Sequence, residues 1–229
     1  TPSNSSAASD VYKRQVLKKD LAKSGNEKRF VKDKKFWDDQ LDELGEPLYS
    51  DIQGPSVLEE ARKRHGDPKL RASDIEMNEL FVAVKDYHLE PYATQNLMDF
   101  CMNHQLSMTN LLLLGIRTYL SKVNNGQEDI TIQNFISRRS THDEWTSGGS
   151  RTIMFPCRTV ISPETDFLSA AYEIQNMQNR IYMHSNYDPA FIMDEMRKRY
   201  HTPEHTSYES CYLCLLYTSP SPRDRTRSR

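Results

Sequence analysis

Residues 109–136 read TNLLLLGIRTYLSKVNNGQEDITIQNFI, and this stretch decides the fold because it holds a helix, a turn and a strand in one run. Its leucine-rich first half, capped by Ser107 or Thr109, predicts a buried helix that ends at Val123. The Asn-Asn-Gly triplet that follows predicts a turn. Ile130, Ile132, Asn134 and Ile136 then alternate with Thr131, Gln133 and Phe135, which predicts a strand. A buried helix that leads directly into a strand indicates an α/β domain built in layers.

The segment before this stretch begins with a long charged helix. Residues 16–44 carry an apolar stripe that includes Phe36 and Trp37, so we expect a helix that docks this aromatic pair onto a sheet and stops at Gly45. Turn dipeptides over 47–74 then indicate a long connection with one short helical turn inside it.

The remaining elements follow from the same patterns. Residues 80–89 alternate loosely and predict a strand, 94–105 place apolar side chains on one helical face, and 151–161 are again β-prone. Thr165 is expected to cap an amphipathic helix, and a last helix runs to Tyr200. The predicted order is strand, helix, helix, strand, strand, helix, helix, which is a layered α/β pattern.

The composition is that of one folded domain. The chain has 229 residues, of which 37% are hydrophobic and 27% charged, and this excludes collagen-like and fully disordered classes. No apolar run approaches the ~20 residues of a membrane helix, so we expect no membrane partner. Four cysteines without a disulfide framework fit a reducing compartment, and we expect a cytoplasmic protein.

Both ends of the chain resemble translated sequencing adapters. Residues 5–15 read SSAASDVYKRQ and residues 214–224 read CLLYTSPSPRD, and each back-translates into an adapter-like string in the matching orientation. Such segments are set aside before the fold is considered. The expected division of the chain is a disordered adapter-derived tail at 1–15, the domain at 16–200, a linker at 201–213 and a second disordered adapter-derived tail at 214–229.

Without these tails the chain is acidic. The whole sequence carries a net charge of −2, and the two tails hold more basic than acidic side chains, so the segment between them is more negative still. A nucleic-acid binder is expected to present a basic face. We therefore expect no nucleic-acid partner.

One group of residues near the C-terminus has the spacing of a zinc site. His201 and His205 form H-x3-H, and Cys211 and Cys214 form C-x2-C, which are ligand types and spacings that zinc accepts. Cys214 falls in the adapter-like tail, and the segment between the two pairs is polar and loop-like. We interpret the group as a polar linker that runs into the tail, and we expect no bound metal.

The order of the elements and five short motifs resemble the C-terminal half of a condensation domain of nonribosomal peptide synthetases. The motifs are FWDDQL at 36–41, the helix, turn and strand within 109–132, Ser137-Arg138-Arg139, a glycine at Gly149 nine residues before Arg158, and HSNYDP at 184–189. This resemblance implies an α/β fold, namely an incomplete two-layer sandwich lobe of the coenzyme A-dependent acyltransferase class, also called chloramphenicol acetyltransferase-like.

The sequence also departs from the family pattern. Gln133 and Arg138 stand where the family has glycines, and Ile153 stands where it has an asparagine. These changes argue against a substrate channel of the usual form. The family's general base belongs to an H-H-x-x-x-D-G loop, and none of the seven histidines has a histidine neighbour. We expect the base to be encoded upstream of Val16, and we expect no catalytic residue in this chain.

The resemblance implies that Arg139, Arg158 and His184 line a substrate channel. Each also has a structural interpretation, because the two arginines fit ion-pair partners at the surface and His184 fits a helix C-terminal cap. Cys101 and Cys157 occur in apolar patterns and are interpreted as small core residues rather than nucleophiles.

The resemblance implies a parent enzyme that forms amide bonds between aminoacyl or peptidyl thioesters carried by carrier proteins. The phosphopantetheine arms of those proteins are its implied substrates, and no cofactor is expected to bind directly. The implied partners are the N-terminal lobe of the same domain and peptidyl carrier proteins, and we expect the fragment alone to be inactive. Two other hypotheses stay open: a non-catalytic condensation-like module that binds carrier proteins, and an unrelated soluble α/β interaction domain.

Overall fold

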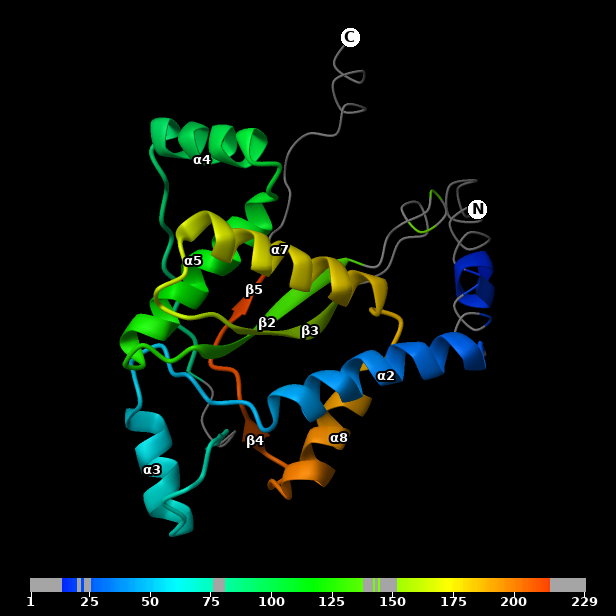
Figure 1. The fold of residues 1–229 in the computed structure, drawn as a ribbon, viewed down its shortest axis with the longest axis vertical. Helices are drawn as coiled ribbons and strands as arrows, with labels where there is room; N and C mark the ends of the chain where they lie inside the picture. The colour runs from blue at the N-terminus through cyan, green and yellow to red at the C-terminus, as the bar shows by residue number, and fades with distance from the viewer. Residues whose placement is uncertain are drawn as a thin grey trace, which may run out of the picture.

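The computed structural model describes residues 14–19, 22, 26–75, 81–137, 142, 144 and 152–214 (Figure 1). Besides a helical stretch at 14–19, its elements in chain order are α2 (Glu27–Leu44), α3 (Ser56–His65), β1 (Ser73–Asp74), α4 (Pro91–Asn103), α5 (Met108–Val123), β2 (Asp129–Ser137), β3 (Thr152–Val160), α7 (Phe167–Met183), α8 (Pro189–Tyr200), β4 (Thr206–Ser207) and β5 (Tyr212–Leu213). None of the helices in these ranges is long and apolar enough to cross a membrane. Most residues of the two expected tails lie outside the described residues.

A three-stranded sheet in the order β3-β2-β5 lies at the centre of the fold (Figure 1). β2 and β3 are antiparallel in continuous register, from Asp129 opposite Val160 to Ser137 opposite Thr152. β5 runs parallel to β2 on its other side, while β1 and β4 pair as a separate two-stranded sheet. Residues 201–213, expected as a linker, thus contain two short strands that pair with strands formed earlier in the chain.

The helices α5 and α7 cover one face of this sheet and form the first apolar cluster. Its buried members are Leu106, Leu113, Leu114, Leu120, Ile130, Ile132, Ile161, Ala170, Ala171 and Ile174. The predicted helix and strand of residues 109–136 are therefore confirmed as α5 and β2. Ser107 is the N-cap of α5, since its hydroxyl oxygen accepts a hydrogen bond from the Asn110 backbone nitrogen at 3.1 Å.

The helices α2 and α8 enclose a second apolar cluster with β3 and the end of α7. Trp37 stacks on Phe155 of β3 with ring centroids 5.6 Å apart, which confirms the docking onto the sheet for this member of the aromatic pair. The ring of Phe36 stacks on His184, at the end of α7. α2 ends at Gly45 as predicted, with a φ of 66° that favours glycine. It begins only at Glu27, because Asn26 caps it through its side-chain oxygen.

Residues 81–90 are extended but form no strand, so the strand predicted over 80–89 is wrong for the residues that the structure describes. A strand needs a hydrogen-bonded neighbour as well as alternation, and in the described ranges no other segment pairs with this one. Pro91 does not merely end the segment but occupies the first turn of α4, where its missing N–H is harmless. α4 therefore starts earlier than the predicted helix over 94–105.

The N-cap of α7 is Asp166, one residue after the predicted Thr165. Its carboxylate accepts hydrogen bonds from the backbone nitrogens of Leu168 at 3.1 Å and Ser169 at 3.0 Å. Hydrogen bonds from the side chain and backbone of Ser169 lower the pKa of Asp166. The negative charge of a carboxylate is stabilised by the positive N-terminal end of the helix dipole, whereas the Thr165 hydroxyl is neutral.

Replacing Asp166 with alanine is expected to lower the melting temperature at pH 7. Because folding lowers the pKa of this group, its ionised contribution is complete above the ordinary aspartate pKa and is lost as the pH falls through the folded value. In circular dichroism melts, the gap between wild type and variant should be constant above about pH 5 and narrow below about pH 4. Glu164→Ala is the matched control and should show no such gap. A gap that widens in acid would contradict this assignment.

Candidate functional site

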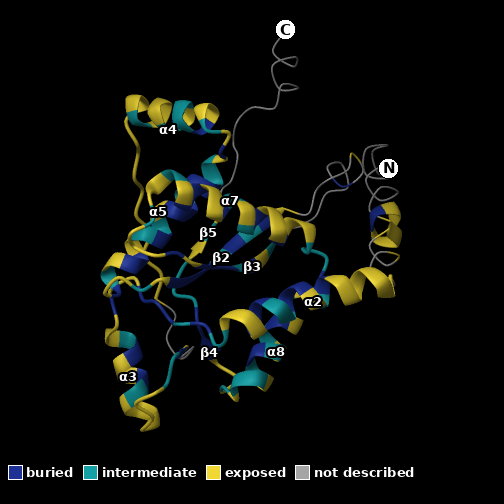
Figure 2. Cartoon of the chain, viewed as in Figure 1, coloured by how far each residue is buried: buried dark blue, intermediate teal, exposed yellow. Residues whose placement is uncertain are grey.

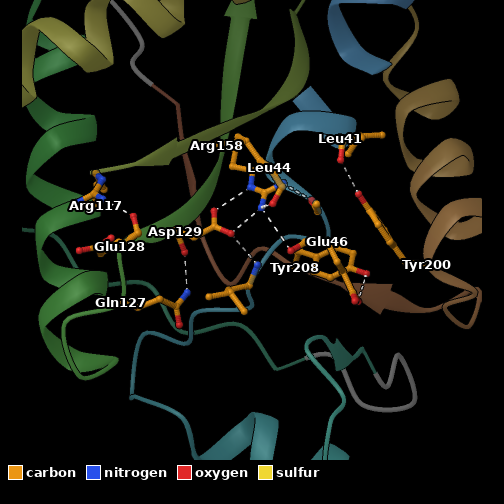
Figure 3. Close-up of polar contacts among 12 residues, drawn as sticks. Leu41, Leu44, Glu46, Arg117, Gln127, Glu128, Asp129, Arg158, Tyr200 and Tyr208 are labelled. Atoms are coloured by element: carbon orange, nitrogen blue, oxygen red, sulfur yellow. Dashed lines mark hydrogen bonds and ion pairs between the residues drawn. The ribbon is translucent and has the colours of Figure 1, made fainter. Parts of the chain in front are cut away.

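Arg158 on β3 and Asp129 at the start of β2 form a buried, bidentate ion pair (Figure 3). Nε and Nη2 of the guanidinium donate to the two carboxylate oxygens at 2.8 and 2.7 Å. The strand register explains this contact, because Asp129 lies opposite Val160 and Arg158 opposite Thr131, which makes the pair diagonal neighbours on one face. The two side chains are only 8% and 11% exposed, so neither charge has access to much water.

The same guanidinium closes the C-terminal end of α2. Its Nη1 and Nη2 atoms donate, at 2.7 to 3.3 Å, to the backbone oxygens of Leu44, Gly45 and Glu46. The last carbonyls of a helix have no partner inside the helix, and a cation is favoured beside them. We call Arg158, Asp129 and the carbonyls of residues 44–46 the α2 clamp. The clamp joins the end of α2 to both β2 and β3.

The contacts of the α2 clamp give Arg158 a structural role. These hydrogen bonds and the ion pair all go to groups of the protein itself, in agreement with the ion-pair interpretation, but the pair is buried rather than at the surface. The register of β2 and β3 places Asp129 beside Arg158. The sequence alone did not identify Asp129 as this partner. The role of Arg158 in lining a substrate channel stays a prediction.

His184 contacts the middle of α2. It is the C-cap of α7, as the structural alternative predicts, and its Nδ1 lies 2.8 Å from Oδ1 of the buried Asp33. Its ring stacks on Phe36 with centroids 4.3 Å apart and an interplanar angle of 11°. Its backbone oxygen also accepts a 3.4 Å hydrogen bond from Nε1 of Trp37. His184 therefore ties α7 to α2 by a polar contact, a stacked ring and a backbone contact.

Of the three predicted channel residues, the two that the structure describes, Arg158 and His184, contact different parts of α2. Arg158 contacts the end of α2, whereas His184 contacts Asp33, about 16 Å away along the helix axis. Arg139 lies outside the described residues, as does Arg138. Ile153 packs against the second apolar cluster, so the residue that replaces the family asparagine has an apolar neighbourhood.

Two cavities border Arg158, and they differ in size. The first is about 30 Å³, is mostly apolar and lies between α2, α8 and the sheet. Measured in this way, a cavity needs about 10–15 Å³ to hold one water molecule, so this cavity is too small for a substrate arm. The second is an open groove of about 280 Å³ between α2 and α7 along the free edge of β3. Of the two, the second approaches the size of a small-molecule site, about 300–1,000 Å³.

The groove carries opposite charges from two helices. Glu43 of α2 and Glu173 and Arg180 of α7 line it. Sequence reasoning missed these residues, although Glu173 and Arg180 are two turns apart on one face of α7 and so could be recognised as a pair. Among the described lining residues there is no histidine, cysteine or lysine. The groove can therefore bind and orient a polar chain, but it offers no base of the kind that the family uses.

The cysteines are placed as core or terminal residues. Cys157 is 3% exposed, and burial raises the pKa of its thiol to about 12. Burial also raises the pKa of Cys101. The interpretation of these two as core residues is confirmed by their burial. Cys214 is exposed.

Alkylation should therefore distinguish the cysteines of the folded chain. With iodoacetamide at about pH 8, we expect Cys214 to react first and Cys157 to react only after unfolding in guanidinium, because the thiolate is the nucleophile. Peptide mass spectrometry after timed quenching measures both sites. Labelling of Cys157 as fast as Cys214 in the folded chain would show that β3 is not buried as described.

Within the described ranges, no group of three or more histidine, cysteine, aspartate or glutamate side chains is arranged to hold a metal ion. His201, His205, Cys211 and Cys214, which have zinc-like spacing in the sequence, belong to no such group. In the chain, β4 lies between the two pairs and joins β1. His201 itself ends α8 in the left-handed conformation.

Comparison with protein families gives a match to the Condensation domain family over residues 7–207. Among curated proteins, a plipastatin synthase subunit of Bacillus subtilis (strain 168) is 24% identical over 109 residues, which is 48% of this chain and 4% of that protein. The chain thus spans a small part of the length of this relative.

Solved structures show the same fold. The first condensation domain of the calcium-dependent antibiotic synthetase, solved with a substrate analogue, matches with a TM-score of 0.67 at 14% identity, over 90% of this chain and 41% of that one. VibH, a nonribosomal peptide synthetase condensation enzyme, matches with a TM-score of 0.59 at 15% identity, over 91% and 43%. The mixed α/β fold is therefore the acyltransferase-like fold in incomplete form. With the family match over most of its length, this chain belongs to the Condensation domain family.

Proposed function

We propose that this chain is one wall of a condensation site that joins carrier-tethered aminoacyl or peptidyl thioesters through an amide bond. The single observation that carries the proposal is the family match over residues 7–207. The chain has no H-H-x-x-x-D-G motif, since no two of its histidines are adjacent. The match over about 41% of a solved relative supports a wall that works together with further structure.

Amide formation makes three demands on such a site. A base must lie about 3 Å from the attacking amine, the tetrahedral oxyanion needs stabilisation, and both thioesters must be held in line. The described residues support only the last demand, through the groove between α2 and α7. We propose that Arg158 and His184 are positioning residues that hold α2 as a fixed border of the channel, and that Arg139 lines it.

The proposed partners follow from this division of work. The N-terminal lobe of the same domain supplies the histidine base, and peptidyl carrier proteins deliver the two thioesters on phosphopantetheine arms. These arms are substrates, and no cofactor is proposed to bind the chain directly. The four free cysteines support a reducing, cytoplasmic location.

The purified chain is expected to form no amide bond. Two carrier proteins, one loaded with an aminoacyl donor and one with an acceptor, are incubated with the chain, and intact-protein mass spectrometry follows the acceptor. We expect product only at the rate of the enzyme-free control, because no histidine of the family motif is present. Product that increases with the concentration of the chain would refute the proposal.

A second candidate is a non-catalytic module that binds carrier proteins. Gln133 on β2 and Ile153 on β3 favour it, because both replace family residues and both lie in the central sheet. The complete gene distinguishes the candidates, since an intact H-H-x-x-x-D-G supports catalysis and a replaced second histidine supports the module. An unrelated interaction domain is excluded by the family and fold matches.

A further inference from the structure

Residues 81–90 are an extended stretch whose large side chains are exposed (Figure 2). Phe81 is 97% exposed, Tyr87 83%, Val82 81%, Val84 79% and Leu89 63%. In the described ranges, no strand pairs with this stretch. Soluble proteins rarely leave so much adjacent apolar surface in water unless it is an interaction site.

The first half of this stretch, residues 81–84, has the sequence of a strand covered on both faces. Successive side chains of a strand point to opposite faces, so Phe81 shares one face with Tyr87 and Leu89, while Val82 and Val84 occupy the other. Over residues 81–84 both faces are apolar, as in strands buried between two layers, whereas Lys85, Asp86 and His88 make the rest of the stretch more polar. Val82 and Val84 are also β-branched, which favours extended backbone over helix.

The apolar surface continues into α4. Tyr92 is 78% exposed, Met102 66% and Met98 48%, while the opposite side of the helix contacts the body through Cys101 and Phe100. Figure 1 shows α4 standing away from the central sheet, at the far end of this extended stretch. The strand-like stretch and the outer side of α4 thus form one continuous exposed apolar surface within residues 81–103, which we call the docking segment.

We propose that residues 81–90 add as a strand to a sheet in the part of the condensation domain that this chain does not span. The solved relatives supply the reason for this occupant, because the match covers 90% of this chain but only 41% of the first of them, which leaves more than half of that domain to cover such a segment. Strand addition uses backbone hydrogen bonds for affinity and side-chain pockets for register. The inference rests on the proposed function, because it takes this remainder to be the opposite lobe of the same site.

A second copy of the chain is a weaker occupant for physical reasons. Two docking segments paired with each other would form an isolated two-stranded ribbon, which leaves the faces of the strands in water and is marginally stable. The burial of Val82 and Val84 on one face and Phe81 on the other needs layers on both sides. A larger sheet with its own covering helices meets that need.

Hydrogen exchange tests this proposal on two proteins, the present chain and the complete domain expressed from the full native gene. Mass spectrometry should find the amides of residues 81–84 unprotected in the chain alone, and at least about 100-fold slower to exchange in the complete domain. Equal, unprotected exchange in both proteins would overturn the proposal. Protection in the chain alone that rises with its concentration would assign the segment to a second copy and would also overturn it.

Paired variants extend the test to stability. Val82→Asp should lower the melting temperature of the complete domain and leave that of the chain alone unchanged, because the side chain is 81% exposed there. Lys85→Ser, in the same segment, is the matched control and should change neither. A complete domain that protects residues 81–84 but forms no amide bond would count against the proposed function and leave this inference intact.

Discussion

Replacing Arg158 with methionine is expected to lower the free energy of unfolding by about 3–5 kcal/mol. The variant leaves the Asp129 carboxylate, 11% exposed, without its cation, and it leaves the carbonyls of residues 44–46 without their donor. Urea titration followed by tryptophan fluorescence measures this change. The matched control is Lys34→Met, which removes a surface pair with Asp38 and should lower the same quantity by about 0.3–0.5 kcal/mol.

A double variant separates the ion pair from the carbonyl contacts. Arg158→Met combined with Asp129→Leu removes both charges, so we expect it to be more stable than Arg158→Met alone. It should remain less stable than wild type, because the backbone oxygens at the end of α2 still lack a donor. If Arg158→Met were no more harmful than Lys34→Met, the α2 clamp would not hold the lobe together.

Replacing Trp37 with alanine is expected to cost about 3–5 kcal/mol, the usual range for a buried aromatic side chain. Trp37 is 5% exposed, stacks on Phe155 and donates its ring N–H to the His184 backbone oxygen. The variant removes the ring contact between the middle of α2 and β3, so we expect cooperative loss of α2 and the neighbouring α8. Thermal melts followed by circular dichroism measure the loss.

The control for Trp37 is another aromatic residue of the same helix. Phe30 is 42% exposed, and its ring contacts the rings of Tyr187 and Phe191. Phe30→Ala should therefore lower the stability less than Trp37→Ala. Equal destabilisation by the two variants would mean that α2 is held along its whole length rather than chiefly at Trp37.

Local patterns were sufficient for the elements whose neighbours lie close in sequence. The run of leucines before Val123 and the alternating isoleucines after it pack against each other, so α5 and β2 follow from residues 109–136 alone. Caps are equally local, although Asp166 rather than Thr165 supplies the one at α7, because neighbouring residues with capping ability differ in strength.

Contacts distant in sequence could not be predicted in this way. The register of β2 and β3 decides that Asp129 meets Arg158, and no local signal carries that register. Residues 81–89 show that a local pattern alone is also not sufficient. Their alternation indicates a strand, but no strand in the described part of this chain pairs with them. The family motifs that contain His184 and Arg158 indicated which residues to consider, but they did not indicate their contacts. The structure shows that both side chains contact α2.

Amide-bond formation by complementation tests the central claim most directly, since that claim is that this chain is a wall without a base. The chain and the separately expressed remainder of the native condensation domain are assayed alone and mixed, with loaded carrier proteins as donor and acceptor. We expect dipeptide product in the mixture and none with the chain alone. Product from the chain alone that is lost in His184→Ala would place the base within these residues and contradict the account.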